Sequence, residues 1–198
     1  MNDVINSMIG YLDNGGAVMI PILLCSFALW VMIIERMIVY RRWEKHDIDL
    51  STALAMMRNG EKGSETPGLR RDLVRFFAIH KTSSAAVNQS LLDQYRLHVR
   101  PNLTQRIGII ATLAAIAPLL GLLGTVSGMI TTFDVITLFG TGNAKAMAGG
   151  ISESLITTQS GLTVAIPGMF MGVYLSRRCA RLSGKLDETI SILKRSMR

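Results

Sequence analysis

Two long stretches without any charged residue constrain this chain more than any other feature. No acidic or basic side chain occurs in residues 108–133 or in residues 154–176. A helix of about 20 apolar residues is long enough to cross the hydrocarbon core of a bilayer, and backbone polar groups in lipid must bond within their own segment. The two stretches therefore predict two membrane-spanning helices, over residues 107–135 and 150–176.

A third uncharged run, residues 14–34, lies closer to the N-terminus and predicts a first span over residues 14–40. Trp30, Tyr40 and Trp43 lie near its far end, where aromatic rings suit the membrane–water interface. The polar residues before this run contain no basic cluster and no small-residue cleavage pattern. We therefore expect the first span to be retained rather than cleaved as a signal peptide.

The composition is that of the membrane class of protein. Hydrophobic residues make up 49% of the chain, the mean hydropathy is +0.35, and the apolar residues are clustered into runs rather than spread. The net charge of +7 does not indicate nucleic-acid binding, because the basic residues flank the apolar runs and only 6% of the residues are aromatic. Cys25, Cys179 and the three histidines lack metal-ligand spacing, so we expect no metal site and no cofactor.

The distribution of charge predicts the orientation of the chain. Residues 41–106 hold 12 basic and 7 acidic side chains, and residues 177–198 hold 7 basic and 2 acidic ones. The charged side chains in residues 1–13 are all acidic. Because basic segments stay on the cytoplasmic side, we expect the N-terminus outside and both basic segments in the cytoplasm. Glu35 and Arg36 are interpreted as a charge pair at the membrane boundary, without a role in transport.

Residues 41–106 are expected to be helical in pieces. Apolar residues recur about every 3.6 positions in residues 50–58 and 69–80, and residues 85–99 form a third candidate helix. Pro101 is expected to kink that helix or to mark where it restarts. The second piece carries an arginine cluster, expected on a solvated face near lipid headgroups, with a partner-docking surface as the alternative. Its members are Arg70, Arg71 and Arg75.

One carboxyl group, that of Glu153, lies at the start of the third predicted span. A carboxylate within a span is costly to keep there, so it marks a functional site by default and can exchange a proton with its surroundings. On an ideal helix, Thr157 and Ser160 lie within about 40° of it and are placed to bond the carboxyl group or to hold water. Two alternatives stay open: Glu153 only bonds a neighbouring helix, or the hydroxyls only satisfy backbone carbonyls.

Small residues recur at helix-contact spacing in both later spans. They are Gly121, Gly124 and Gly128 in the second span, and Gly161, Ala165, Gly168 and Gly172 in the third. Small residues let helices approach closely in lipid, so we predict helix-packing contacts there and expect Gly168→Leu to disrupt an oligomer. The glycines do not match a phosphate-binding loop, and no nucleophile–base pair accompanies them, so the chain is not expected to be an enzyme.

Three motifs lie in this region. They read Ala117-Pro-Leu-Leu-Gly-Leu-Leu-Gly-Thr-Val-Ser-Gly128, Gly150-Ile-Ser-Glu-Ser-Leu-Ile-Thr-Thr158 and Gly161-Leu-Thr-Val-Ala-Ile-Pro167. Together, at this separation, they resemble the ExbB/TolQ/MotA family of proton-channel proteins, and most of all its ExbB members from TonB-type systems. The resemblance covers roughly residues 105–180 and extends loosely to the first span.

The resemblance implies a protein of the bacterial inner membrane that forms a ring, a homopentamer in the family. The ring surrounds the single-span helices of two copies of a smaller partner similar to ExbD or TolR. Such a proton channel uses the proton-motive force to energise a TonB-like protein for outer-membrane nutrient uptake. In the proton pathway, the family's glutamate corresponds to Glu153 and its two threonines to Thr125 and Thr158, whereas helix geometry favours Thr157.

Members of the family differ in ways that the chain only partly resolves. MotA-like subunits have four spans and a larger cytoplasmic domain, whereas three spans are predicted here. An ExbB-like role and a TolQ-like role in outer-membrane integrity both stay open, as do proton and sodium coupling. A non-conducting membrane scaffold is the alternative from a different functional class.

The sequence thus predicts an all-α membrane protein with three transmembrane helices, the second and third long and extending into the cytoplasm. Its expected parts are a periplasmic N-terminus with an amphipathic segment (1–13), a first span (14–40), a cytoplasmic helical segment (41–106), a second span (107–135), a short periplasmic loop (136–149), a third span (150–176) and a basic cytoplasmic tail (177–198).

Overall fold

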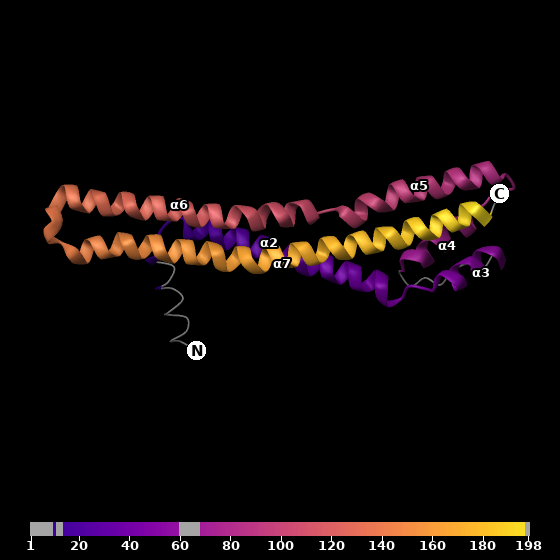
Figure 1. Ribbon diagram of the computed structural model, residues 1–198, viewed down its shortest axis with the longest axis horizontal. Coiled ribbons are helices and arrows are strands. Elements are labelled where there is room, and N and C mark those ends of the chain that lie inside the picture. The colour runs from indigo at the N-terminus through magenta and orange to yellow at the C-terminus, as the bar shows by residue number, and fades with distance from the viewer. Residues whose placement is uncertain (1–9, 11–13, 60–67, 197–198) are drawn as a thin grey trace. The chain divides into compact units, whose positions relative to one another are not determined.

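A computed structural model describes residues 10, 14–59 and 68–196, and every regular element in this part of the chain is a helix (Figure 1). The expected all-α class is therefore confirmed for these residues. The amphipathic segment expected in residues 1–13 lies outside them, apart from Gly10.

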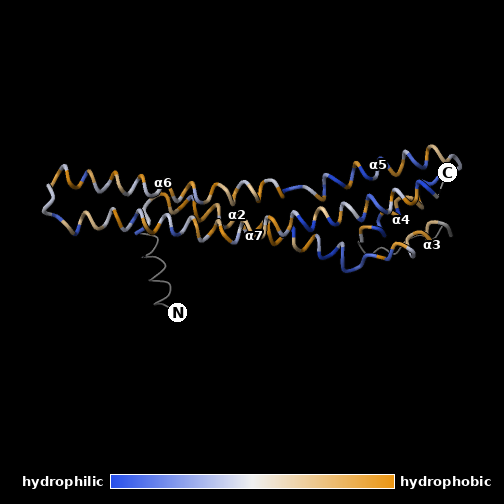
Figure 2. Tube along the Cα trace, in the orientation of Figure 1, coloured by the Kyte–Doolittle hydropathy of each residue, from blue (hydrophilic) through white to orange (hydrophobic). Residues whose placement is uncertain are grey.

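The chain divides into two compact units. The first, which we call the apolar unit, comprises Met1–Ile33 and Ile109–Gly172. The second, the polar unit, comprises Ile34–Gly108 and Val173–Arg198. The coloured trace in Figure 2 shows hydrophilic residues gathered in the helices of the polar unit, whereas α6 is hydrophobic along most of its length.

Three long helices dominate the described chain: α2 (Met19–Lys45), α6 (Ile107–Phe139) and α7 (Ala144–Ser196). Among the described residues, α2 and the stretch Ala85–Gly142, which contains α6, are long and apolar enough to cross a membrane. The helix α7 is not among them, because hydroxyl and amide side chains interrupt its apolar residues. The third span therefore stays a prediction.

Large apolar side chains point outward from the long helices. Phe27 on α2 is 72% exposed, Leu119 on α6 is 62% exposed and Phe170 on α7 is 75% exposed. Extended apolar surface of this kind marks contact with a membrane or with other protein chains rather than with water.

Within the apolar unit, α6 and α7 approach closely because glycines remove side chains from their contact. A Cβ atom added to Gly121 would lie 3.1 Å from the backbone oxygen of Thr157, and one on Gly161 would lie 2.7 Å from that of Ala117. A Cβ atom on Gly124 would overlap the side chain of Thr157. The remaining small residues of the expected stripe are also buried: Gly128, Ala165 and Gly172. The stripe therefore packs helices of one chain against each other.

The helix α2 completes the packing of this unit. A Cβ atom on Gly168 would lie 2.7 Å from Cδ2 of Leu29 on α2 and 3.3 Å from Cβ of Ala114 on α6. Beside this contact, one buried cluster joins all three helices through Cys25, Ala117 and Ala165. The direct effect of Gly168→Leu is therefore expected inside the subunit, before any effect on contacts between subunits.

The connection between α6 and α7 is shorter than the loop expected over residues 136–149. The helix α6 continues to Phe139, and only the 3₁₀ turn η1 (Gly140–Gly142) and Asn143 separate it from α7. Gly140 adopts a φ of +66°, a left-handed conformation that favours glycine. The Asn143 side chain accepts a hydrogen bond from the backbone N–H three residues on, at 3.2 Å, and so caps α7. The basic tail is not a separate element, because α7 runs through it without a break.

The described residues of the polar unit form three shorter helices: α3 (Leu50–Asn59), α4 (Leu69–His80) and α5 (Ala85–Thr104). The first two begin where apolar periodicity predicts. The third begins at Ala85, as expected, but continues through Pro101. The chain restarts as α6 only after Arg106, whose φ of +67° breaks the helix.

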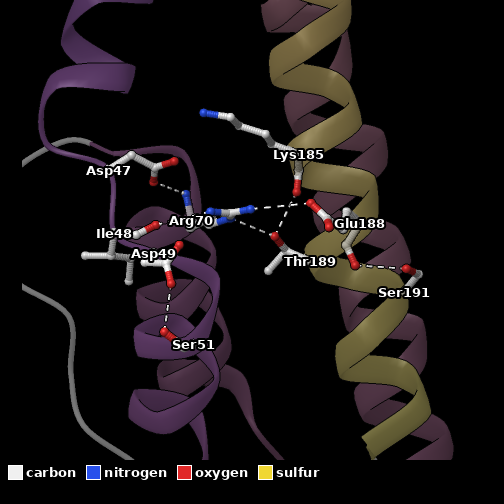
Figure 3. A network of polar contacts seen from close by, with 9 residues as sticks. All are labelled: Asp47, Ile48, Asp49, Ser51, Arg70, Lys185, Glu188, Thr189 and Ser191. Carbon is white, nitrogen blue, oxygen red and sulfur yellow. Dashed lines mark hydrogen bonds and ion pairs between the residues drawn. The ribbon is translucent and has the colours of Figure 1, made fainter.

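One member of the arginine cluster is buried rather than solvated (Figure 3). Arg70 is only 8% exposed. Its Nε donates to Oγ1 of Thr189 at 3.0 Å, its Nη1 donates to the backbone oxygen of Ile48 at 3.4 Å, and its Nη2 lies 3.5 Å from Oε2 of Glu188. The expected solvated face therefore holds for the exposed Arg75 but is wrong for Arg70, which ties α4 to α7.

Glu35 and Arg36 bind α2 to the break between α5 and α6. Glu35 forms an ion pair with Arg106. Arg36 is only 4% exposed, and it donates from Nη1 to the backbone oxygen of Asn102 at 3.0 Å and from Nη2 to Oε1 of Gln105 at 3.3 Å. The pair interpreted from the sequence as boundary charges thus has a structural role in the polar unit.

A further charged contact in the polar unit joins Glu44 on α2 to Arg178 on α7. The Nε atom of Arg178 donates to Oε2 of Glu44 at 3.1 Å. This hydrogen bond holds the pKa of the Glu44 carboxyl below its usual range. A carboxyl group with a lowered pKa stabilises the fold above its unfolded-state pKa and loses that effect as the pH falls through the folded-state value, so the contact is at full strength at neutral pH.

The close approach of α6 and α7 predicts a difference between two alanine substitutions. Gly161→Ala places a methyl group against the backbone of Ala117, and overpacking of this kind costs about 1–3 kcal/mol. Gly149→Ala, in the same helix, meets no atom within 4 Å and should keep or raise stability. Thermal unfolding of the full-length protein in detergent measures both. Equal melting temperatures for the two variants would contradict the glycine-mediated contact.

Candidate functional site

Glu153 occupies the third turn of α7 and is partly buried. Its carboxyl group lies against Gly16, in the turn that precedes α2. A Cβ atom on Gly16 would overlap the Glu153 carboxyl group, with its Cδ only 2.6 Å away. The carboxyl group is therefore held beside the backbone of the first long helix's N-terminal turn.

Glu153 differs from the other charged residues described in the apolar unit. Asp134 near the end of α6 and Lys145 at the start of α7 are both exposed. Among the described residues of this unit, Glu153 alone combines a charged side chain with partial burial. No described side chain forms an ion pair or a hydrogen bond with its carboxyl group.

The neighbouring hydroxyl groups bond the helix backbone rather than the carboxyl group. The hydroxyl of Thr157 donates to the backbone oxygens of Glu153 at 2.9 Å and Ser154 at 3.0 Å. The hydroxyl of Ser160 donates to the backbone oxygen of Ile156 at 2.7 Å. Of the interpretations open from the sequence, these bonds match the one in which the hydroxyls satisfy carbonyls. Each bond is local, as is usual for Ser and Thr inside helices.

The structure places Thr157 and Thr158 on the contact between α7 and α6. Thr157 is fully buried against Gly124. Thr158 is partly buried, and its hydroxyl donates across to the backbone oxygen of Gly121 at 3.2 Å. Both hydroxyls therefore donate to backbone oxygens, that of Thr157 within α7 and that of Thr158 across to α6.

Thr125 meets α7 through its backbone. Its backbone oxygen accepts a hydrogen bond from the Ser154 hydroxyl at 3.1 Å, while its own hydroxyl donates to the backbone oxygen of Leu122 at 2.6 Å. Its partner Ser154 is the residue next to Glu153 in α7, so the Gly-Thr-Val motif of α6 meets the Ser-Glu-Ser motif of α7 at this point. Two of the three motifs that carry the family resemblance thus lie side by side.

Sequence reasoning missed Gly16. The only signal available was the pair Gly15–Gly16 just before an apolar run, which reads as an ordinary turn. In the structure Gly16 has a φ of +62° and Gly15 is buried, with Ile156 of α7 close to it. Among the residues that the structure describes, no cluster of three His, Cys, Asp or Glu side chains forms that could hold a metal ion.

Comparison with known proteins assigns the chain to a family. Residues 61–188 match the profile of the MotA/TolQ/ExbB proton channel family, which is more than half of the 198 residues. The chain therefore belongs to this family of inner-membrane proteins, whose members are channels and not enzymes.

Individual relatives carry both the ExbB and the TolQ name. The chain is 41% identical over 83 residues to the biopolymer transport protein ExbB of Aquifex aeolicus, covering 42% of this chain and 56% of that protein. It is 27% identical over 202 residues to the Tol-Pal system protein TolQ of Haemophilus influenzae, covering 89% and 88%. It is 25% identical over 186 residues to ExbB of Salmonella typhimurium, covering 86% and 76%. The chain thus spans about half the length of the Aquifex relative and is similar to both kinds of protein.

The bond from Thr158 across to α6 predicts a measurable effect on stability. Thr158→Val keeps the shape of the side chain and removes the interhelical hydrogen bond, which in membrane proteins contributes about 0.6 kcal/mol on average. Thr163→Val is the matched control, because the exposed Thr163 hydroxyl bonds only Gln159 of its own helix. Thermal unfolding in detergent should show a lower melting temperature for the first variant only, and a loss of the same size in the control would contradict the assignment.

Proposed function

We propose that this chain is the proton-conducting subunit of an inner-membrane motor that uses the proton-motive force to energise a TonB-like protein for outer-membrane nutrient uptake. The observation that supports this most is the position of Glu153: a partly buried carboxyl group without an ion-pair partner among the described residues, in the motif that the family shares. An ionisable group within a membrane-spanning segment is costly to keep, so a functional role is its default interpretation.

The proposed assembly is a homopentameric ring around two copies of a single-span partner similar to ExbD or TolR. Family membership supports such partners, and the large outward-facing apolar side chains of α2, α6 and α7 supply surface for lipid and for neighbouring subunits. In this arrangement the partner contributes the second titratable group, so that proton transfer takes place between chains.

The proposed topology has three spans, a periplasmic N-terminus and a cytoplasmic C-terminus. The charge distribution supports it, since both basic segments lie on one side in this arrangement. The length of α7 supports it as well, because 53 residues extend about 80 Å at 1.5 Å each. This length exceeds the thickness of the bilayer, so α7 is long enough to form a third span and to continue into the cytoplasm.

In the proposed mechanism, Glu153 takes up a proton from the periplasmic side and releases it towards the cytoplasm. One elementary charge crossing the potential releases about 2.3 kcal/mol per 100 mV. Thr125, Thr158 and Thr157 are the proposed companions along the path. Each of their hydroxyls donates to a backbone carbonyl in the structure, so passing a proton on requires the hydroxyl to turn from that carbonyl towards the next group of the path.

A TolQ-like role is the second candidate. It is favoured by the alignment with the Haemophilus TolQ protein, which covers 89% of this chain and 88% of that protein. In that role the same proton flow would support outer-membrane integrity. The two roles differ in the partner that is energised, and Glu153 transfers the proton in both.

The experiment that tests the proposal is complementation of a deletion strain with Glu153→Gln, scored by growth on a scarce nutrient that needs outer-membrane uptake, such as chelated iron. Glutamine keeps the size and polarity of the side chain and cannot give up a proton. We expect growth to be lost while the subunit still copurifies with its single-span partner. Asp134→Asn, at the exposed acidic residue, is the control and should grow normally.

Growth of the Glu153→Gln strain at the wild-type rate would contradict the proposal and favour a non-conducting scaffold. Normal growth of the deletion strain itself, together with leakage of periplasmic enzymes, would favour the TolQ-like role. Replacing sodium in the medium separates proton from sodium coupling.

A further inference from the structure

We propose that Gly16 is a positioning residue for Glu153, and that the backbone of the turn before α2 fixes the position of the Glu153 carboxyl group. This inference rests on the proposed function, because it concerns the residue to which proton transfer is assigned. It adds a role for the first span's N-terminal turn, which the sequence motifs of the second and third spans do not contain.

The geometry of the contact carries the inference. The space beside the Cα of Gly16, where any other residue would place its Cβ, is filled by the carboxyl group of Glu153: the Cδ atom would lie 2.6 Å and the Cγ atom 3.2 Å from that Cβ. Atoms at such distances must shift, and the moving part would be the end of the Glu153 side chain. A side chain at position 16 therefore displaces the group that is assigned to proton transfer.

The backbone at this position also favours glycine. Gly16 has a φ of +62°, in the left-handed region that other L-residues rarely adopt. The preceding Gly15 is buried, and its Cβ position is bounded by Met19 of α2 at 3.0 Å and by Ile156 of α7 at 3.4 Å. The turn is therefore fixed against α7 on the same face that presents Glu153, so its backbone is a stable surface for the carboxyl group.

The chain offers a matched control for the strain of a left-handed alanine. Gly140 has a φ of +66°, almost the same as that of Gly16, but no atom lies within 4 Å of its Cβ position. Gly140→Ala and Gly16→Ala therefore both place an alanine at a left-handed φ, and only Gly16→Ala displaces the carboxyl group.

The first measurement is the rate at which dicyclohexylcarbodiimide, an apolar reagent that modifies carboxylic acids, labels Glu153 in membranes containing the full-length chain and its single-span partner. Mass spectrometry of the labelled peptide reports the rate. We expect faster labelling in Gly16→Ala, because the alanine methyl group displaces the Glu153 carboxyl group, and an unchanged rate in Gly140→Ala. An unchanged rate in Gly16→Ala, or the same change in both variants, would overturn the proposal.

The second measurement is proton flux in vesicles made from the same membranes. We expect Gly16→Ala to lose most of its flux, because small displacements of a reacting group cost large factors in rate, and Gly140→Ala to keep wild-type flux. Faster labelling with normal flux would overturn the positioning role. Retained flux in Glu153→Gln would instead overturn the proposed function. The labelling rates would then still test whether Gly16 contacts Glu153.

A double-mutant cycle keeps the test valid if Gly16→Ala assembles poorly. Glu153→Asp withdraws the carboxyl group by one methylene and makes room for the alanine methyl. We expect Gly16→Ala to lower the melting temperature less in the Glu153→Asp background than in the wild type, whereas Gly140→Ala should act equally in both. An equal effect of Gly16→Ala in the two backgrounds would show that the residues do not touch and would overturn the proposal.

Discussion

The close approach of α6 and α7 is the constraint on which the apolar unit depends. Lipid tails are as apolar as leucine, so helices in a membrane gain little from simply leaving lipid, and close packing must hold them together. Gly121, Gly124 and Gly161 permit that packing, since each lies where a side chain would meet the opposite helix. The same contact places the Gly-Thr-Val motif of α6 beside the Ser-Glu-Ser motif of α7. The position of Glu153 thus follows from packing that requires glycine.

The polar unit is organised by charge rather than by glycine. Arg70 lies almost fully buried among partners on α7 and the segment before α3, and Arg36 clamps the junction where α5 ends. Buried arginines of this kind need several hydrogen bonds to offset the loss of water. The helices α2 and α7 each contribute residues to both units.

Much of the helical organisation could be predicted from the sequence, because charge-free runs and apolar periodicity leave few alternatives. The helix starts at Leu50 and Leu69 follow from apolar periodicity. The loop over residues 136–149 was overestimated because Gly and Asn residues there suggested a longer break than the single turn that the chain needs. The burial of Arg70 and the contact of Glu153 with Gly16 could not be predicted, since both join segments more than 100 residues apart. Local sequence patterns, such as apolar periodicity, do not indicate which distant segments come into contact.

The most direct test of the account is infrared difference spectroscopy of the assembled complex in membranes, with and without an imposed pH gradient. If Glu153 exchanges protons during the working cycle, a carbonyl band of a protonated carboxyl group should change when the gradient is applied. That band should be absent from Glu153→Gln. A gradient-dependent band that persists in Glu153→Gln, or a Glu153 band that does not respond to the gradient, would contradict the assignment of proton transfer to this residue.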